Sequence, residues 1–252
     1  DKVDTLTGMI VAGERPTGSR DPFGMRRAAQ GVIRILADLP ELTGVGRAIA
    51  IDGLTAKALE AYSGQPGLAD APAALAAFLG ERVASVFEQR GADVRNVRAV
   101  MAGQTTLVPL TIRRRLDVLP EFTDTAEFKQ LAVLFKRVRN IARQLPEDAF
   151  QAGEAAGLAL TALSEPAEVA LRDEIARRTP AIQSAVEAGD GYRKAFSEAA
   201  AFGPAVATFF DDVMVMAEDP AVREARLRLL RRLEALILQL ADISEMVPQS
   251  DT

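Results

Sequence analysis

The segment DTAEFKQLAVLFKRVRNIARQ, residues 124–144, shows the pattern on which the fold assignment depends. Its apolar residues recur every three or four positions, which is the spacing of an amphipathic helix. At about 100° per residue they share an arc of about 140°. They are Phe128, Leu131, Leu134, Phe135, Val138 and Ile141. The spacing therefore predicts one helix with a buried side, opened by a capping pair of Asp124 and Glu127 and ended by Pro146.

The other side of this helix is basic. Four polar residues fall within about 60° of one another on the helix surface: Lys129, Lys136, Asn140 and Arg143. Arg139 lies between this group and the apolar side, and Arg137 lies beyond the group. A row of cations at one- to two-turn spacing can follow RNA phosphates, and amides or guanidinium groups can hydrogen-bond the base edges of an unstacked loop. The candidate RNA-binding residues are Lys129, Lys136, Arg137, Arg139, Asn140 and Arg143. A solvated helix face without a ligand is the alternative interpretation.

Helical spacing extends over almost the whole sequence, and alternating strand patterns are nearly absent. We expect an all-α fold with two helical domains in series, residues 1–103 and 104–252. Turn and breaker residues in GQTTLVP, residues 103–109, place the boundary there, although an ordinary interhelical loop would have the same composition. The one candidate strand is GRAIAI, residues 46–51. Helices are expected at residues 21–39, 54–62, 73–90, 94–102, 124–144, 166–186 with a break at Pro180, 192–216 with an interruption at Gly203–Pro204, and 220–246.

Two of these helices begin with an Asp-Pro pair. Asp21 and Asp219 are expected as N-caps, each followed by a proline in the first turn, where the missing N–H does no harm. Pro40 is expected to end the first helix after an apolar side that includes Phe23 and Ile35.

Composition limits the chemistry that the chain can perform. There is no cysteine and no histidine among the 252 residues, so thiol chemistry and the commonest general base and metal ligand are absent. No phosphate-binding glycine loop or nucleophile motif is present, and we expect no catalytic residue and no metal site. No apolar run is long enough to cross a membrane, no signal peptide is visible, and a cytoplasmic location is expected.

The charge of the chain is unevenly distributed. The net charge is -5, but residues 105–145 carry eight Lys and Arg against four Asp and Glu. That segment is therefore at +4 and the remainder at -9, which makes the basic region a local surface feature. Arg113, Arg114 and Arg115 either extend this surface or form a solvated helix end.

The C-terminal third holds two further candidates. Asp211 and Asp212 invite a metal or acid–base interpretation, but adjacent helical residues project about 100° apart and do not converge on one ion. Their apolar neighbours are expected to pack in the interior: Phe209, Phe210, Val213, Met214 and Met216. The last helix carries an apolar seam that could contact neighbouring helices or another subunit: Leu229, Leu233, Leu236, Leu240 and Ile243. Its other side carries arginines that pair in part with Glu224 and Glu234: Arg223, Arg226, Arg228, Arg231 and Arg232.

Five segments together resemble the C-terminal third of the β subunit of bacterial tetrameric glycyl-tRNA synthetases. They are DKVDTLTG (1–8), PTGSRDPFGMRRAA (16–29), FKRVRNIARQ (135–144), FFDDVMVMAEDPAVREARLRLLRRL (209–233) and ADIS (241–244). Gly24 departs from the alanine usual in that family, and residues 44–104 are hard to match position by position. The resemblance implies that the chain is part of a longer protein.

This resemblance also implies a function. Residues 1–103 resemble the end of a helical HD-like domain, in which Asp1 would be the late metal aspartate. Because the chain lacks histidine, we expect neither a metal nor phosphohydrolase activity. Residues 104–252 resemble the DALR-type anticodon-binding domain. The implied partners are tRNA(Gly) and the α subunit, with no DNA and no membrane.

In that family ATP, with Mg, is used on the α subunit while the β subunit holds and orients the tRNA. The expected function is therefore tRNA binding within a glycine–tRNA ligase, by a part that is itself non-catalytic and holds no cofactor. The alternative is a non-catalytic helical scaffold that docks a subunit. The loop at residues 13–20 is expected to be an architectural bend, with a direct tRNA contact through Arg15 or Arg20 as the less favoured interpretation.

Overall fold

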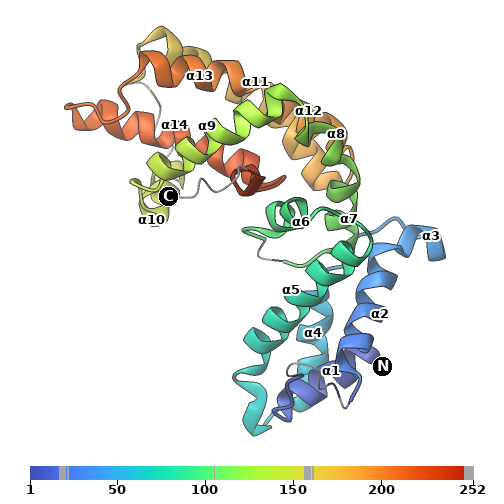
Figure 1. The fold of residues 1–252 in the computed structure, drawn as a ribbon. Coiled ribbons are helices and arrows are strands. Elements are labelled where there is room, and N and C mark those ends of the chain that lie inside the picture. The colour runs from blue at the N-terminus through green and yellow to red at the C-terminus, as the bar shows by residue number, and fades with distance from the viewer. Residues whose placement is uncertain (17–20, 22, 105, 156–159, 161, 247–252) are drawn as a thin grey trace, which may run out of the picture. The chain divides into compact units, whose positions relative to one another are not determined.

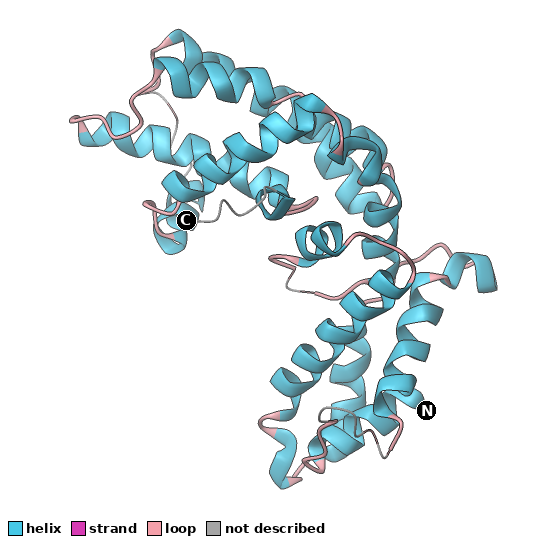
Figure 2. Ribbon diagram, in the orientation of Figure 1, coloured by secondary structure: helices cyan, strands magenta, loops and turns pink. Residues whose placement is uncertain are grey.

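A computed structural model describes residues 1–16, 21, 23–104, 106–155, 160 and 162–246. Within these ranges every regular element is a helix and there is no strand (Figure 2), so the all-α prediction is confirmed. The chain divides into two compact units, residues 1–116 and residues 117–252. None of the described helices is both long enough and apolar enough to cross a membrane.

The N-terminal unit is built on four packed helices. α1 contacts α2, α4 and α5, and α2 and α5 contact each other (Figure 1). Leu6, Ile10, Ile33, Leu75 and Val83 are almost fully buried in its core. The α-helices of this unit are α1 (Lys2–Val11), α2 (Met25–Ala37), α3 (Leu39–Thr43), α4 (Ile51–Leu59), α5 (Ala71–Gln89), α6 (Val94–Met101) and α7 (Pro109–Val118), which runs to the boundary; Glu60–Tyr62 and Pro66–Leu68 are 3-10 turns.

Three expectations for the N-terminal unit were wrong. Residues 46–50 form a non-helical connection, and α4 begins at Ile51, whose N–H donates to the carbonyl of Leu107 at 2.9 Å. Pro40 does not end α2 but lies in the first turn of α3, where a proline needs no hydrogen-bond partner. Phe23 and Ile35 are 50% and 47% exposed, so neither belongs to the core.

The N-terminus of α2 is capped by Asp21, which lies three residues before the N-cap position. Its carboxylate accepts hydrogen bonds from the N–H groups of Met25 at 2.7 Å and Arg26 at 3.1 Å. Asp21 thus satisfies the first free N–H groups of the helix, although the residue at the N-cap position is Gly24.

The loop between α1 and α2 is tied to the end of α1. Arg15 Nη1 donates to the carbonyls of Ile10 at 2.8 Å and Glu14 at 2.9 Å. Arg15 is thereby used to cap carbonyls at a helix C-terminus. Arg20, the other arginine of this loop, lies outside the described residues.

The C-terminal unit is a bundle in which α9 contacts α13, α14 and the 3-10 turn η3, while α11 contacts α12, α13 and α14. Its core is rich in phenylalanine: Phe128, Phe135, Phe196, Phe202 and Phe209 are at most 1% exposed. The elements are α8 (Pro120–Thr123), α9 (Ala126–Ala142), α10 (Glu147–Ala155), α11 (Pro166–Ala188), α12 (Tyr192–Ala200), α13 (Gly203–Asp212), α14 (Pro220–Leu238) and η3 (Ile243–Met246).

Several helix boundaries in this unit differ from the expected ones. The N-cap of α9 is Thr125, whose hydroxyl accepts from the N–H of Phe128 at 3.3 Å, and not Asp124. α11 passes through Pro180 without a break and packs against α12, α13 and α14. α14 ends at Leu238 and not near Met246. Its start was predicted correctly, because the Asp219 carboxylate accepts from the N–H of Ala221 at 2.8 Å.

The connection from α13 to α14 alternates between buried and exposed residues. Val213 and Val215 are 6% and 7% exposed, whereas Met214 and Met216 are 77% and 45% exposed. Val213 has extended dihedral angles, and successive side chains of an extended chain point to opposite sides. The prediction that both methionines pack in the interior was therefore wrong, while Phe209 and Phe210 are buried as expected.

Candidate nucleic-acid interface

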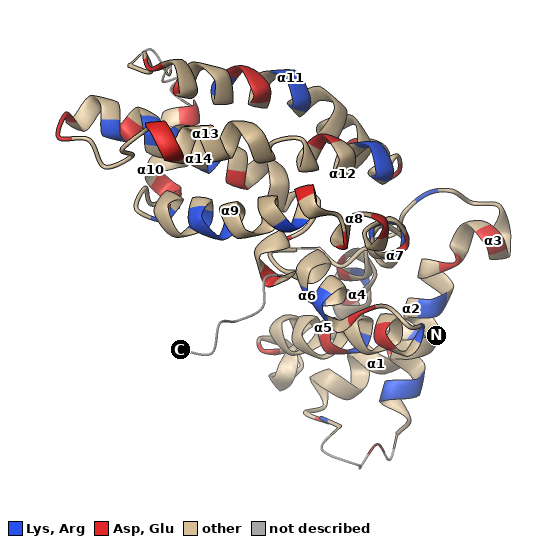
Figure 3. Ribbon diagram, turned by 45° about the horizontal axis from the view of Figure 1, so that its top comes forward, with Lys and Arg blue, Asp and Glu red and all other residues tan. Residues whose placement is uncertain are grey.

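α9 presents a basic outer face. Of the six candidate residues on this helix, five are exposed: Lys129, Lys136, Arg137, Asn140 and Arg143. Basic residues along α9 are drawn blue in Figure 3. The apolar side of the helix faces inward, with Phe128, Leu131, Phe135 and Val138 buried. The amphipathic pattern of the sequence therefore positions these five side chains as expected.

The cations of this face differ in their partners. Lys129 pairs with Asp124 at 3.3 Å, but both side chains are well exposed, and such a pair contributes little. In the part of the chain that the structure describes, Lys136 and Arg143 have no ion pair and the Asn140 amide has no side-chain hydrogen bond. Their charge and hydrogen-bonding capacity are available to a ligand.

The guanidinium group of Arg137 lies over an aromatic ring. Its guanidinium carbon is 4.2 Å from the centre of the Phe210 ring, which belongs to α13. Phe210 is 7% exposed, so the ring is a fixed support, while Arg137 itself stays exposed. A cation–π contact of this kind orients the guanidinium plane without neutralising its charge.

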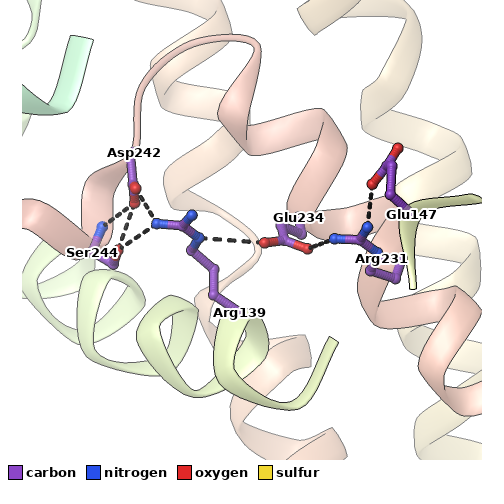
Figure 4. Close-up of polar contacts among 6 residues, drawn as sticks. All are labelled: Arg139, Glu147, Arg231, Glu234, Asp242 and Ser244. Atoms are coloured by element: carbon purple, nitrogen blue, oxygen red, sulfur yellow. Dashed lines mark hydrogen bonds and ion pairs between the residues drawn. The ribbon is translucent and has the colours of Figure 1, made fainter. Parts of the chain in front are cut away.

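Arg139 faces the interior of the unit and is separated from the other five candidates. Its Nε donates to Glu234 at 3.3 Å, and its Nη1 donates to Asp242 and, at 3.2 Å, to Ser244 (Figure 4). The Arg139 side chain is 20% exposed, and those of Glu234 and Asp242 are 5% and 4% exposed. Two buried carboxylates thus occupy this arginine.

The same network continues across α14 to α10. Glu234 also accepts from Arg231 Nη1 at 2.7 Å, and Arg231 pairs in turn with Glu147 at the start of α10. Asp242 is further held by the hydroxyl of Ser244 at 2.5 Å. The network therefore connects α9, α10, α14 and η3 through charged groups.

The arginines of α14 are bound within the protein. Arg226 pairs with Glu168, and Arg232 pairs with Glu154 at 2.8 Å. Arg228 is 5% exposed and donates to the carbonyls of Ala149 and Phe150, both at 3.2 Å. A Cβ added at Gly153 would clash with the guanidinium group of Arg228, so a larger residue at this position of α10 requires that buried group to move.

The expected apolar seam of the last helix is also used inside the unit. Its five members are between 0% and 4% exposed: Leu229, Leu233, Leu236, Leu240 and Ile243. Because this chain covers them, they offer no surface for docking another subunit.

The Arg113–Arg115 triplet of α7 does not form an open basic patch. Arg113 bonds Asp38 at 2.9 Å and Glu41 at 2.6 Å, and Arg115 is 4% exposed. Asp38 also accepts a bidentate pair of bonds from Arg90, at 2.9 and 2.6 Å. The hydrogen bonds from Arg90, together with the one from Arg113, lower the pKa of Asp38 below its ordinary value.

The acidic residues do not assemble into a cation site. Among the described residues no three Asp or Glu side chains come together in a way that could hold a metal ion. Asp211 and Asp212 are both exposed at the end of α13. Asp4, in the segment that resembles the HD-like motif, accepts a hydrogen bond from Tyr62 at 3.3 Å.

Two family models match this chain on either side of α7. Residues 1–102 match the model of the glycyl-tRNA synthetase beta subunit, and residues 132–245 match the DALR anticodon binding domain. The chain belongs to the glycyl-tRNA synthetase β-subunit family. The DALR match includes Lys136, Arg137, Asn140 and Arg143 of the α9 face and excludes Lys129.

Similar curated proteins agree with this assignment. The chain is 38% identical over 246 residues to the glycine–tRNA ligase beta subunit of Dechloromonas aromatica, covering 98% of this chain and 33% of that protein. It is 38% identical over 249 residues to the corresponding subunit of Aromatoleum aromaticum, with 98% and 34% covered. For the Haemophilus influenzae subunit the identity is 36% over 251 residues, with 97% and 33% covered. The chain thus spans about a third of the length of the curated relatives it matches.

Proposed function

We propose that this chain is the tRNA-binding part of a glycine–tRNA ligase β subunit and that α9 grips the anticodon arm of tRNA(Gly). One observation carries the proposal: Lys136, Arg137 and the C-cap residue Arg143 are exposed along the outer side of α9 without a carboxylate partner among the described residues. Phosphate groups are the ligands that such a row recognises most directly. Asn140, between them, can contact a base edge.

Arg139 has a different role in this proposal. Its guanidinium is bound to Glu234 and Asp242, so it holds α9 against α14 and η3 and does not reach RNA. Lys129 contributes weakly at the start of the helix, because Asp124 lies 3.3 Å away.

The catalytic step belongs to a partner in this proposal. The chain has no histidine and no cysteine, and the function assigned to it requires only binding. Glycylation would take place on the α subunit, with ATP and Mg bound there, in the cytoplasm. The present chain would hold and orient the tRNA for that reaction.

Filter binding of tRNA(Gly) to the full-length protein tests this function. We expect replacement of both Lys136 and Arg143 by alanine to lower the affinity about 10-fold or more at moderate salt, since two phosphate contacts are lost. Arg172→Ala with Arg177→Ala is the matched control. It removes the same charge from α11, where Arg177 is exposed and Arg172 is half-buried, and where both are bonded to acids of the same helix, Glu174 and Asp173. Equal affinities for the two double variants would refute the proposal.

A further inference from the structure

Arg137 differs from the other arginines that lie over aromatic rings. Three described arginines are 5.5 to 5.9 Å from a ring centre, and each also binds a carboxylate. These are Arg90 over Phe87, Arg178 over Phe202 and Arg231 over Phe150. Arg137 is closer to its ring, at 4.2 Å, and has no carboxylate partner within the described ranges. The other three are held mainly by ion pairs, whereas Arg137 is held by its ring.

This arrangement leaves one face of the guanidinium plane open. Phe210 covers the inner face and is itself 7% exposed, so it cannot turn away easily. Arg137 as a residue remains exposed, which is consistent with solvent on the side of the guanidinium away from the ring. Planar guanidinium groups and aromatic rings are the surfaces on which proteins stack the unpaired bases of RNA loops.

The neighbours of Arg137 on α9 complete a small binding surface. Val133, one turn earlier, is 58% exposed and is the apolar neighbour of Arg137 at i,i−4 spacing on the helix surface. Asn140, three residues later, is exposed and its amide has no described side-chain partner. Lys136 and Arg143 provide positive charge on the same helix.

We propose that the outer face of Arg137, supported by Phe210 and flanked by Val133 and Asn140, is a stacking subsite for one unpaired nucleobase. The inference rests on the proposed function, because the base is supplied by the anticodon loop that α9 grips. It assigns Arg137 to a base and leaves Lys136 and Arg143 on phosphates. The Asn140 amide lies where it can hydrogen-bond the edge of the stacked base.

An Arg137→Lys variant of the full-length protein separates the positive charge of this side chain from its planar stacking surface. Lysine keeps the charge but has no planar group, so a stacked base loses its support. We expect the affinity for tRNA(Gly) to fall about 5-fold or more, as for the loss of one base stack, with the salt dependence of binding unchanged. Lys136→Arg is the matched control, and it should bind as the wild type does.

Fluorescence identifies the base directly. In tRNA(Gly) transcripts with 2-aminopurine at each anticodon-loop position in turn, we expect binding to change the emission strongly at one position. Arg137→Lys should remove that change, while Lys136→Arg should keep it. The thermal unfolding midpoints of both variants should equal that of the wild type, because both side chains are exposed.

Two results would overturn the subsite. One is wild-type affinity of Arg137→Lys for tRNA, which would show that only the charge matters. The other is retention of the fluorescence change in Arg137→Lys. Either result, combined with weak binding by Lys136→Ala with Arg143→Ala, refutes the subsite and leaves the proposed function standing. Normal binding by that double variant refutes the proposed function instead.

Discussion

α9 and α14 lie in the same unit and are both rich in arginine, yet their charges serve different purposes. On α14, Arg226, Arg228, Arg231 and Arg232 all bind carboxylates of the same unit. On α9, Lys136 and Arg143 have no such partner among the described residues. The availability of a cation therefore depends on the acids of the facing elements and not on the number of cations in the helix.

The contrast holds within α9 itself. Arg139 and Arg143 are one turn apart, but Arg139 is bound to two buried carboxylates while Arg143 faces solvent. Arg139 should therefore support stability, and Arg143 should support binding. The predictions below test this division of roles, starting with the largest expected effect.

Arg139→Ala should destabilise the C-terminal unit by about 3–5 kcal/mol, because Asp242 would remain buried without a cationic partner and Glu234 would keep only Arg231. Arg143→Ala should change the free energy of unfolding by less than about 0.5 kcal/mol, as expected for an exposed side chain. Urea unfolding of both variants measures the difference. Equal stability of the two would show that the network in Figure 4 contributes nothing.

Gly153→Ala tests the packing of α10 on α14. The new methyl group would meet the buried Arg228 guanidinium at about 2.0 Å, and overpacking of this kind costs about 1–3 kcal/mol. Gly80→Ala in α5 is the control, since no atom lies within 4 Å of the added carbon, and there alanine should stabilise the helix by up to about 1 kcal/mol. Thermal unfolding should show opposite shifts. A stabilising Gly153→Ala would mean that Arg228 is not fixed at this place.

The effect of pH on the stability of the N-terminal unit should be smaller than the effects of Arg139→Ala and Gly153→Ala. Hydrogen bonds from Arg90 and Arg113 lower the folded-state pKa of Asp38, so its contribution is full above the unfolded pKa of about 3.9 and is lost as the pH falls through the folded value. Asp38→Asn should therefore cost up to about 1 kcal/mol at pH 7, and the difference from the wild type should shrink below about pH 4. Urea unfolding at both pH values measures this. A difference that grows on acidification would contradict the lowered pKa.

The sequence predicted the local features of α9 well. Phe128, Leu131, Phe135 and Val138 follow the helical period, and because a helix turns its two faces apart, the exposure of Lys136 and Arg143 follows from the same period. Local chemistry was less decisive at the start of the helix. Thr125 and Asp124 are both good capping residues, and only the backbone path selects Thr125.

The pairing of Arg139 with buried carboxylates could not be derived from its neighbours in the sequence. Its partners Glu234 and Asp242 lie 95 and 103 positions away, so only the tertiary fold brings them together. The same holds for Phe210 under Arg137. The exposed Met214 and Met216 alternate with the buried Val213 and Val215, which is a local signal of extended chain, whereas the helix expected over residues 192–216 predicts interior packing for all four.

The salt dependence of tRNA(Gly) binding tests the central claim most directly. If α9 and its surroundings neutralise about four phosphates, log K should fall with log salt at a slope of about -3 to -4 for the wild type. Lys136→Ala with Arg143→Ala should make the slope about two units shallower, whereas Arg172→Ala with Arg177→Ala should leave it unchanged. An unaltered slope for the Lys136 and Arg143 double variant would contradict the claim that these cations of α9 hold RNA phosphates.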